Sequence, residues 1–262
     1  MKDASTGARF ARRLWEARRD GNLIRVGEGE RPADEAEAYA VQRGITEASG
    51  CAVAGFKIGA TAQFAMDVLG VDGPFFGPLY RESFRPTGST VRLPVAHSPG
   101  IEAEFVVGLA SNLPPRDPPW TVEEVREAVS WVAPGLEIVG SRLEGGLTGA
   151  GMLAIADGGA NIDFVLGPTD GDWQSADLGS HPVVLDINGV ESGSGHSGML
   201  VFGDPIAGVA WLANRAEVAP RGLRAGDAVT TGTCTGIRPI APGDEVSADY
   251  GSLGVVRARF AD

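Results

Sequence analysis

One short segment, GIEAEFVVG at residues 100–108, constrains the fold of this chain more than any other. β-Branched and aromatic residues fill it and glycines stand at both ends, which is typical of a β-strand. Glu102 and Glu104 are two residues apart, and that spacing directs both side chains to one face of a strand. Neighbouring carboxylates repel each other and are costly to bury, so the fold must place a positive charge between them.

A third glutamate, Glu137, belongs to a second strand-like segment, GLEIVGSRL at residues 135–143. Three convergent carboxylates would form an all-oxygen site for a hard divalent cation, Mg²⁺ or Mn²⁺, with positions left for water and substrate. The alternative is that Glu102 and Glu104 form the solvent-exposed face of an amphipathic edge strand. The sequence therefore predicts a metal site made of the three glutamates, with an exposed edge strand as the competing interpretation.

The segment between the two strands favours the metal site. A proline-rich loop at residues 112–120 precedes a predicted helix over 121–132, in which Thr121 is the N-cap and Glu124 its capping-box partner. A strand, a crossover helix and a second strand would place Glu137 beside the other two glutamates.

A lysine, Lys57, stands in the middle of another predicted strand, CAVAGFKIGATA at residues 51–62. One interpretation is an alternating strand whose lysine faces solvent. The other is a partly buried ammonium group that binds a carboxylate or keto oxygen, or transfers a proton. Because Phe56 and Ile58 flank it within a glycine-bounded core, we predict that Lys57 orients or protonates a substrate.

The remaining pattern is that of an α+β protein with a β-rich body. A small helical N-terminal part is predicted over residues 1–50 and a catalytic part over 51–262. Helices are expected over 4–20, 32–48, 63–69 and about 204–212, a loop whose Phe75 and Phe76 wall a pocket over 70–80, a hairpin with its turn at Asn188-Gly189 over 182–192, and strands with turns from 223 onward.

A few further polar residues are candidates for the site. The loop at residues 232–236, GTCTG, offers backbone N–H groups and hydroxyls that suit a carboxylate. Asp157 or Asn161 could reach the site, although a turn residue bonded to its own backbone is the favoured interpretation of each. His196 lies in a glycine-rich loop and is expected to be solvated. The sequence has neither GxGxxG after a strand nor a Walker loop, which argues against nucleotide binding.

Charge and cysteine usage narrow the class of protein. The formal net charge of −12 argues against nucleic acid and anionic membranes as partners. Cys51 and Cys234 form no disulfide framework and no CxxC motif, which favours a reduced, cytoplasmic protein. No apolar run approaches the roughly 18 residues of a membrane span. Arg9, Arg12 and Arg13 are not followed by an apolar signal core, so no export signal is predicted.

Seven segments occur in the order seen in the fumarylacetoacetate hydrolase superfamily: GFKIGAT, GVDGPFFG, IEAEF, PGLEIVGSR, GDPIAGVAWLANRA, GLRAGDAVTTGT and PGDEVSADYGSLG. The chain most resembles the 2-keto-4-pentenoate hydratase and 4-oxalocrotonate decarboxylase branch, from about residue 32 onward. The resemblance implies a mixed β-roll, a homo-oligomer, and a Mg²⁺ or Mn²⁺ ion held by Glu102, Glu104 and Glu137.

The resemblance also implies which residues meet the substrate. Lys57 would face a small 2-keto acid, and the loop at 232–235 would hold its carboxylate. The expected substrate contacts are Thr61, Phe76 and Thr233, with Lys57 and Glu102 as the catalytic residues.

The implied activity is that of a metal-dependent lyase in aromatic catabolism. The metal would chelate a 2-keto or 2-hydroxydienoate acid through its carboxylate and 2-oxygen, and would stabilise an enolate. Addition of water to a 2-hydroxy-2,4-dienoate, giving a 4-hydroxy-2-keto acid, is the predicted reaction. The alternatives are decarboxylation of a 4-oxalocrotonate-like diacid, C–C bond hydrolysis and keto–enol tautomerisation.

Two departures from the family pattern bear on these alternatives. Phe75 stands where hydratases of the family often carry an acidic residue, which weakens water addition and leaves decarboxylation open. No His-Glu pair occurs on an early helix, which argues against C–C hydrolysis. An inactive small-molecule-binding or scaffold protein of the same fold is the non-enzyme alternative, and the intact carboxylate trio argues against it, since unused buried carboxylates are an electrostatic liability.

Overall fold

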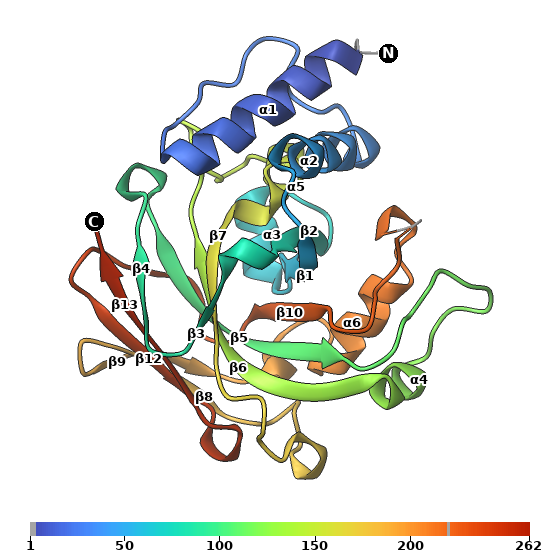
Figure 1. Ribbon diagram of the computed structural model, residues 1–262, viewed down its shortest axis with the longest axis vertical. Coiled ribbons are helices and arrows are strands. Elements are labelled where there is room, and N and C mark those ends of the chain that lie inside the picture. The colour runs from blue at the N-terminus through green and yellow to red at the C-terminus, as the bar shows by residue number, and fades with distance from the viewer. Residues whose placement is uncertain (1–3, 219–220) are drawn as a thin grey trace.

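Two curled sheets form the body of the molecule, and the N-terminal helices cover one end of it (Figure 1). The computed structural model describes residues 4–218 and 221–262. Within them, the larger sheet has eight strands, in the order β2 (Phe75–Tyr80), β1 (Val53–Gly59), β10 (Ala228–Thr233), β5 (Gly100–Leu109), β6 (Val129–Val139), β7 (Asn161–Leu166) and β3 (Phe84–Pro86), with β11 (Arg238–Pro239) paired to β5. The smaller sheet has five: β4 (Ser89–Arg92), β13 (Val255–Ala261), β12 (Glu245–Asp249), β8 (Val183–Ile187) and β9 (Val190–Gly195). This mixed β-roll with few helices confirms the predicted α+β class.

The two N-terminal helices are α1 (Ala4–Asp20) and α2 (Glu35–Ser49). The second begins three residues later than predicted, because the Asp34 side chain accepts from the Glu37 N–H at 2.8 Å and so caps the helix there. Gln42 then ties α2 to the body, donating from Nε2 to the backbone oxygens of Phe76 and Ile155, each at 2.8 Å. The division of the chain at residue 50 stays a prediction.

β2 corrects the predicted loop at residues 70–80. Residues 75–80 pair antiparallel with β1, with Lys57 opposite Gly77. Pro78 made this segment look like a turn, yet β2 is the edge strand of the larger sheet, where a missing N–H donor is tolerated.

β5 and β6 are also connected differently from the prediction. They are direct neighbours and antiparallel, with Glu102 opposite Glu137, so no parallel crossover is involved. The expected capping box at Thr121 and Glu124 is present, but the helix, α4 (Val122–Glu127), is short. Residues 129–132, assigned to the helix from sequence, instead begin β6.

The other elements follow the sequence closely. α3 (Gln63–Leu69) has the predicted bounds, and α6 (Pro205–Ala213) is capped by Asp204. β8 and β9 form the predicted hairpin, in which Asn188 and Gly189 both have positive φ. A short helix, α5 (Met152–Ala156), leads into the turn before β7.

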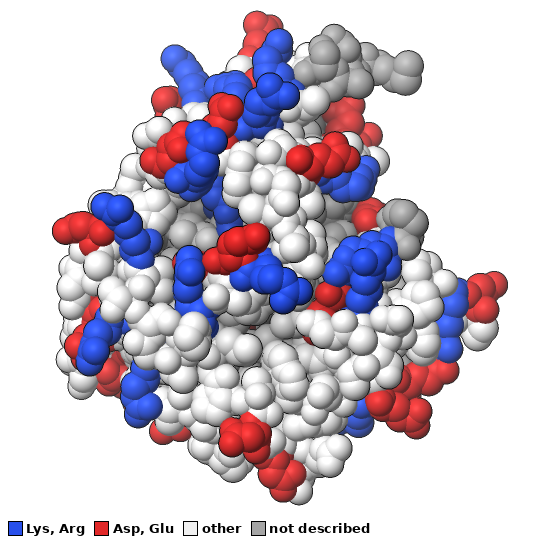
Figure 2. Space-filling view, in the orientation of Figure 1, with Lys and Arg blue, Asp and Glu red and all other residues white. Residues whose placement is uncertain are grey.

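The surface in view carries charges of both signs. Figure 2 shows basic and acidic side chains interspersed on this face, without a continuous basic area. None of the helices in residues 4–218 and 221–262 is both long and apolar enough to cross a membrane.

Candidate metal centre

The ladder between β5 and β6 assembles the three glutamates. Glu102 lies opposite Glu137, and Glu104 projects from the same face of β5 one pleat further along. One carboxylate oxygen from each residue lies within 4.8 Å of the others. The exposed fractions are 8% for Glu102, 1% for Glu104 and 0% for Glu137, so the competing picture of a solvent-exposed edge strand is wrong.

Burial makes the trio electrostatically costly. Loss of solvent raises the pKa of Glu102 to about 7. The charge of Lys57 lowers this pKa, and the charge of Glu137 raises it further. Burial, followed by the charges of Glu137 and Glu102, raises the pKa of Glu104 well above its usual range. A divalent cation would offset this repulsion, and three carboxylates are the donor set that a hard cation prefers.

One carboxylate oxygen of the trio is fully buried and accepts no hydrogen bond. Glu104 Oε2 accepts from the Gly232 N–H at 2.9 Å, and Glu137 Oε1 accepts from Asn161 Nδ2 at 3.0 Å. Glu137 Oε2 is buried without a hydrogen bond. The Lys57 ammonium pairs with this oxygen at 3.4 Å, but one ammonium does not balance three buried carboxylates, so the residues fit a divalent metal.

Lys57 lies beside the trio. Its Nζ donates to the Gly159 backbone oxygen at 3.0 Å and lies 3.4 Å from Glu137 Oε2. Burial acts to lower the pKa of Lys57, but the three carboxylates, Glu137 foremost, outweigh it and the pKa is raised. Lys57 is therefore a buried cation and not a solvent-facing strand residue.

A cavity of about 280 Å³ opens beside these groups. Lys57, Glu102 and Glu104 line it, with Thr61 and Thr233. Apolar side chains form much of the remaining wall, among them Ala65, Leu69, Phe75, Val139, Leu147 and Ile237. The lining thus combines charged and polar groups with apolar side chains, as expected for a small acid with a hydrocarbon tail.

Phe75, and not Phe76, contributes to this cavity. Successive side chains on a strand point to opposite faces, so only one of the two can face the trio. The Phe76 ring stacks on Tyr39 and meets Phe56 edge-on, away from the cavity wall. Phe76, the expected substrate contact, is thus not part of the cavity lining, whereas Phe75 is.

The segment at 232–236 is partly strand, since β10 extends to Thr233. Gly232 adopts φ +101°, and a Cβ there would lie 1.9 Å from Thr61 Oγ1. Only glycine fits this close approach, which lets its N–H reach Glu104.

The remaining polar candidates divide between the site and the scaffold. Asn161 reaches Glu137, whereas Asp157 forms a buried ion pair with Arg142 at 2.9 Å. His196 hydrogen-bonds the Gly179 backbone oxygen and takes no part in the trio. His97 lines the cavity and was not identified from sequence, because only the fold brings residue 97 to the end of β6.

The larger sheet thus encloses a buried carboxylate trio that could hold a metal ion, with a lysine beside it. A family model described as "Fumarylacetoacetate (FAA) hydrolase C-terminal" matches residues 72–261, and the chain belongs to this family. The expected family resemblance is thereby confirmed.

Characterised relatives cover most of the chain. It is 33% identical over 227 residues to a 2-keto-4-pentenoate hydratase from Paraburkholderia xenovorans, spanning 86% of this chain and 83% of the relative. A 4-oxalocrotonate decarboxylase from Pseudomonas putida is 32% identical over 230 residues, spanning 86% and 85%. A solved 4-oxalocrotonate decarboxylase from Pseudomonas putida, complexed with magnesium and adipate, superimposes with a TM-score of 0.87 at 29% identity, covering 99% of both chains.

Proposed function

We propose that the protein is a divalent-metal-dependent hydro-lyase that adds water to a 2-hydroxy-2,4-dienoate and forms a 4-hydroxy-2-keto acid. The observation that carries this proposal is one cavity whose lining combines Lys57 and two carboxylates of the trio, Glu102 and Glu104, with apolar side chains. The metal is Mg²⁺ or Mn²⁺, held by Glu102, Glu104 and Glu137. The names of the relatives support both hydration and decarboxylation. The residues that line the cavity are therefore used to distinguish the two reactions.

The charges in the cavity lining favour a substrate with a single carboxylate. Among the described residues that line the cavity, Lys57 is the one lysine or arginine, and it already faces the trio. A second carboxylate would lie against Leu69, Leu147 or similar side chains. Leaving a carboxylate unpaired there would cost on the order of several kcal/mol. A dienoate ending in an apolar carbon meets no such penalty.

The chemistry divides between the cation and this chain's own groups. When bound, the metal supplies a positive centre that stabilises charge developing on the substrate's carboxylate and 2-oxygen. Loss of the 2-hydroxyl proton and gain of a proton at C5 convert the dienol to a 2-keto-3-enoate. Water then adds its oxygen at C4, and C3 gains a proton.

Lys57 is the group best placed to deliver those protons. Two contacts of Nζ, with Gly159 and Glu137, fix the ammonium, and the side chain lines the cavity. An ammonium has three N–H donors, so one remains for the substrate. Glu102, the most exposed carboxylate of the trio, is the acceptor proposed for the proton of the attacking water. Thr61 and Thr233 provide hydroxyls for the substrate carboxylate.

Decarboxylation of a 4-oxalocrotonate-like diacid is the second candidate, and Phe75 favours it. Phe75 lines the cavity and stands where, by the family resemblance, hydratases often carry an acidic residue. In that reaction the C–C bond to the distal carboxylate breaks and its electrons enter the same dienolate. The absence of a cation at the distal wall, in the described residues, argues against it.

The test separates the two reactions. The protein with Mg²⁺ is incubated with 2-hydroxypenta-2,4-dienoate and, separately, with 4-oxalocrotonate. We expect a 4-hydroxy-2-keto product from the first and no CO₂ from the second. CO₂ without hydration would replace the hydratase assignment by a decarboxylase. A homo-oligomer and a cytoplasmic location remain part of this proposal, and light scattering that gives a monomer of about the chain mass, 27.1 kDa, would contradict the former.

A further inference from the structure

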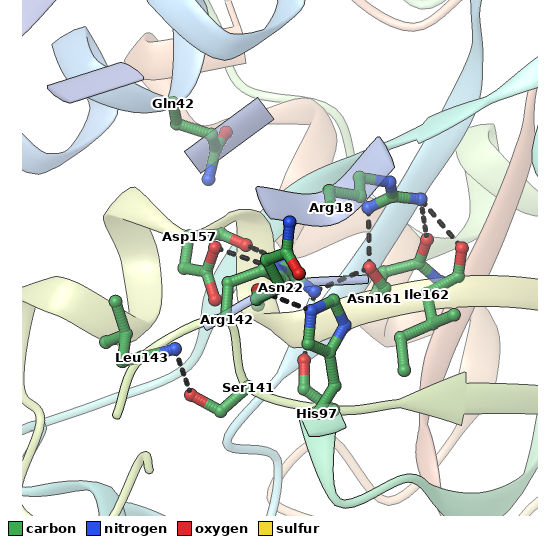
Figure 3. Close-up of polar contacts among 12 residues, drawn as sticks. Arg18, Asn22, Gln42, His97, Ser141, Arg142, Leu143, Asp157, Asn161 and Ile162 are labelled. Carbon is green, nitrogen blue, oxygen red and sulfur yellow. Dashed lines mark hydrogen bonds and ion pairs between the residues drawn. The ribbon is translucent and has the colours of Figure 1, made fainter. Parts of the chain in front are cut away.

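Asn161 lies between the metal centre and the N-terminal helix. It is fully buried at the start of β7. Its Nδ2 donates to Glu137 Oε1 at 3.0 Å, and its Oδ1 accepts from Arg18 Nη2 at 2.9 Å. Figure 3 shows Arg18 projecting from its helix to meet Asn161 and Ile162. A single side-chain amide thus joins α1 to a carboxylate of the trio.

The chemistry of these three groups fixes the orientation of the amide. A guanidinium only donates hydrogen bonds and a carboxylate only accepts them. Arg18 must therefore face the amide oxygen, which leaves the NH₂ group for Glu137. The reversed amide would place its oxygen against the carboxylate and its NH₂ against the guanidinium, losing both bonds. Arg18 selects the one orientation that supplies Glu137 with a donor.

That donor determines which oxygen of Glu137 is available. With Oε1 engaged by Asn161, Oε2 remains without a hydrogen bond and lies beside Lys57. A carboxylate held by one oxygen presents the other in a fixed direction, which lowers the cost of ordering it when a cation binds.

Arg18 is itself held on several sides. Its guanidinium also donates to the backbone oxygen of Ile162 at 2.9 Å and to Ser83 Oγ at 3.1 Å. Arg142 Nη1 donates to the Asn161 backbone oxygen at 2.9 Å, so a second guanidinium fixes the same residue. Burial lowers the pKa of Arg18 to about 10, which still leaves it charged at neutral pH.

We propose that Arg18 is a positioning residue of the metal centre and acts on Glu137 through Asn161. The inference rests on the proposed function, because it assumes that Glu137 is a metal ligand. It adds an element that lies outside the matched family region of residues 72–261, since α1 is at the opposite end of the chain. Docking of α1 and affinity for the metal are thereby coupled.

The test is a comparison of metal affinity in the full-length protein after removal of bound metal. Mn²⁺ binding is measured by calorimetry for the unaltered protein, Asn161→Leu, Arg18→Gln and the double variant. Asn161→Leu keeps the shape of the side chain and removes the donor. Arg19→Gln is the matched control, because Arg19 is the next residue in α1 and its guanidinium pairs with the exposed Asp20.

We expect Asn161→Leu to weaken Mn²⁺ binding about 10- to 100-fold, the range for loss of a group that orients a metal ligand. Arg18→Gln should weaken it less, Arg19→Gln should leave it unchanged, and the double variant should match Asn161→Leu. The rise in Tm on adding Mn²⁺ should be smallest in Asn161→Leu, intermediate in Arg18→Gln and unchanged in Arg19→Gln. Both readouts separate positioning from general loss of stability, which lowers Tm with and without metal alike.

Three outcomes would overturn the inference. Unchanged Mn²⁺ affinity in Arg18→Gln, with only a lower Tm, would make Arg18 a structural anchor. Additive losses in the double variant would show that Arg18 does not act through Asn161. Absence of Mn²⁺ binding by the unaltered protein would remove the metal site on which both this inference and the proposed function depend, whereas the first two outcomes leave the proposed function standing. If Asn161→Leu does not fold, the Mn²⁺ affinity of Arg18→Gln alone tests the inference.

Discussion

Glu102 on β5 and Glu137 on β6 are directly opposite each other in one antiparallel ladder. Directly paired residues on neighbouring strands have Cβ atoms only about 4.5–5.5 Å apart. Like charges at that separation destabilise a sheet, and here both are buried. The backbone register therefore enforces a repulsion that the single charge of Lys57 relieves only in part, which is the physical reason to expect a further cation there.

Loss of one carboxylate should weaken metal binding. Glu104→Gln removes a charged ligand while keeping the side-chain shape, so the affinity for Mg²⁺ or Mn²⁺ should fall by at least about 10-fold. Calorimetry on metal-free protein measures it, and Glu123→Gln, an exposed change in α4, is the control. Equal binding by the Glu104→Gln variant and the unaltered protein would exclude the trio as the metal site.

The metal-free protein should lose stability as the pH rises. Burial raises the pKa of Glu102 from 4.5 to about 7, so the unfolded chain gives up this proton before the folded chain does. The folded state is therefore favoured most at low pH by this group, and its free energy of unfolding falls between about pH 4.5 and pH 7. One pKa unit corresponds to about 1.4 kcal/mol, so the fall amounts to a few kcal/mol.

Urea unfolding in the presence of EDTA measures this dependence. Glu102→Gln should make the dependence shallower, because the amide does not ionise, and Glu104, whose pKa is raised as well, accounts for the part that remains. Saturating Mg²⁺ should flatten the dependence in the unaltered protein by favouring the ionised carboxylates. A metal-free stability that rises across the same pH interval would contradict the assignment of the shift.

Replacing Lys57 should lower turnover strongly without unfolding the protein. Lys57→Met keeps the apolar stem and removes the proton donor, so kcat should fall about 10²- to 10⁴-fold, the usual contribution of a general acid or base. Lys57→Arg is the matched variant, since arginine keeps the charge but does not release its proton. Activity restored by arginine would reduce the role of Lys57 to charge compensation; a collapse of Tm in the Met variant would make it structural.

Much of the site could be predicted from local patterns. The i, i+2 spacing of Glu102 and Glu104 and the apolar residues around Glu137 indicate a trio, because strand geometry directs the side chains. Their burial does not follow from the spacing alone, which also fits an exposed edge strand. The capping box at Thr121 and the Asn188-Gly189 turn are likewise local signals, and each depends on only a few neighbouring residues.

What could not be predicted depends on long-range register. A shift in the β6–β7 ladder between Ile138 and Val139 brings Asn161 to Glu137, and nothing near residue 161 encodes that shift. Arg18 contacts Asn161 across 143 positions of sequence. The antiparallel relation of β5 and β6 was missed for a similar reason, since a helix-like segment between two strands resembles a crossover even where the strands are neighbours.

The apolar wall of the cavity should determine which acids are accepted. Ile237 lines the cavity and is 59% exposed, so a cation introduced there can stay solvated and should cost little stability. In Ile237→Arg, a distal carboxylate gains a partner, and kcat/KM for a diacid such as 2-oxohept-4-ene-1,7-dioate should rise relative to 2-hydroxypenta-2,4-dienoate. A charge-assisted hydrogen bond is worth about 1.5–3 kcal/mol, which corresponds to a change of about 10- to 100-fold in the ratio.

Val201→Arg is the control, because Val201 is an exposed apolar residue outside the cavity lining. An unaltered protein that already prefers the diacid, or an Ile237→Arg ratio equal to that of the control, would show that the apolar wall does not set the preference.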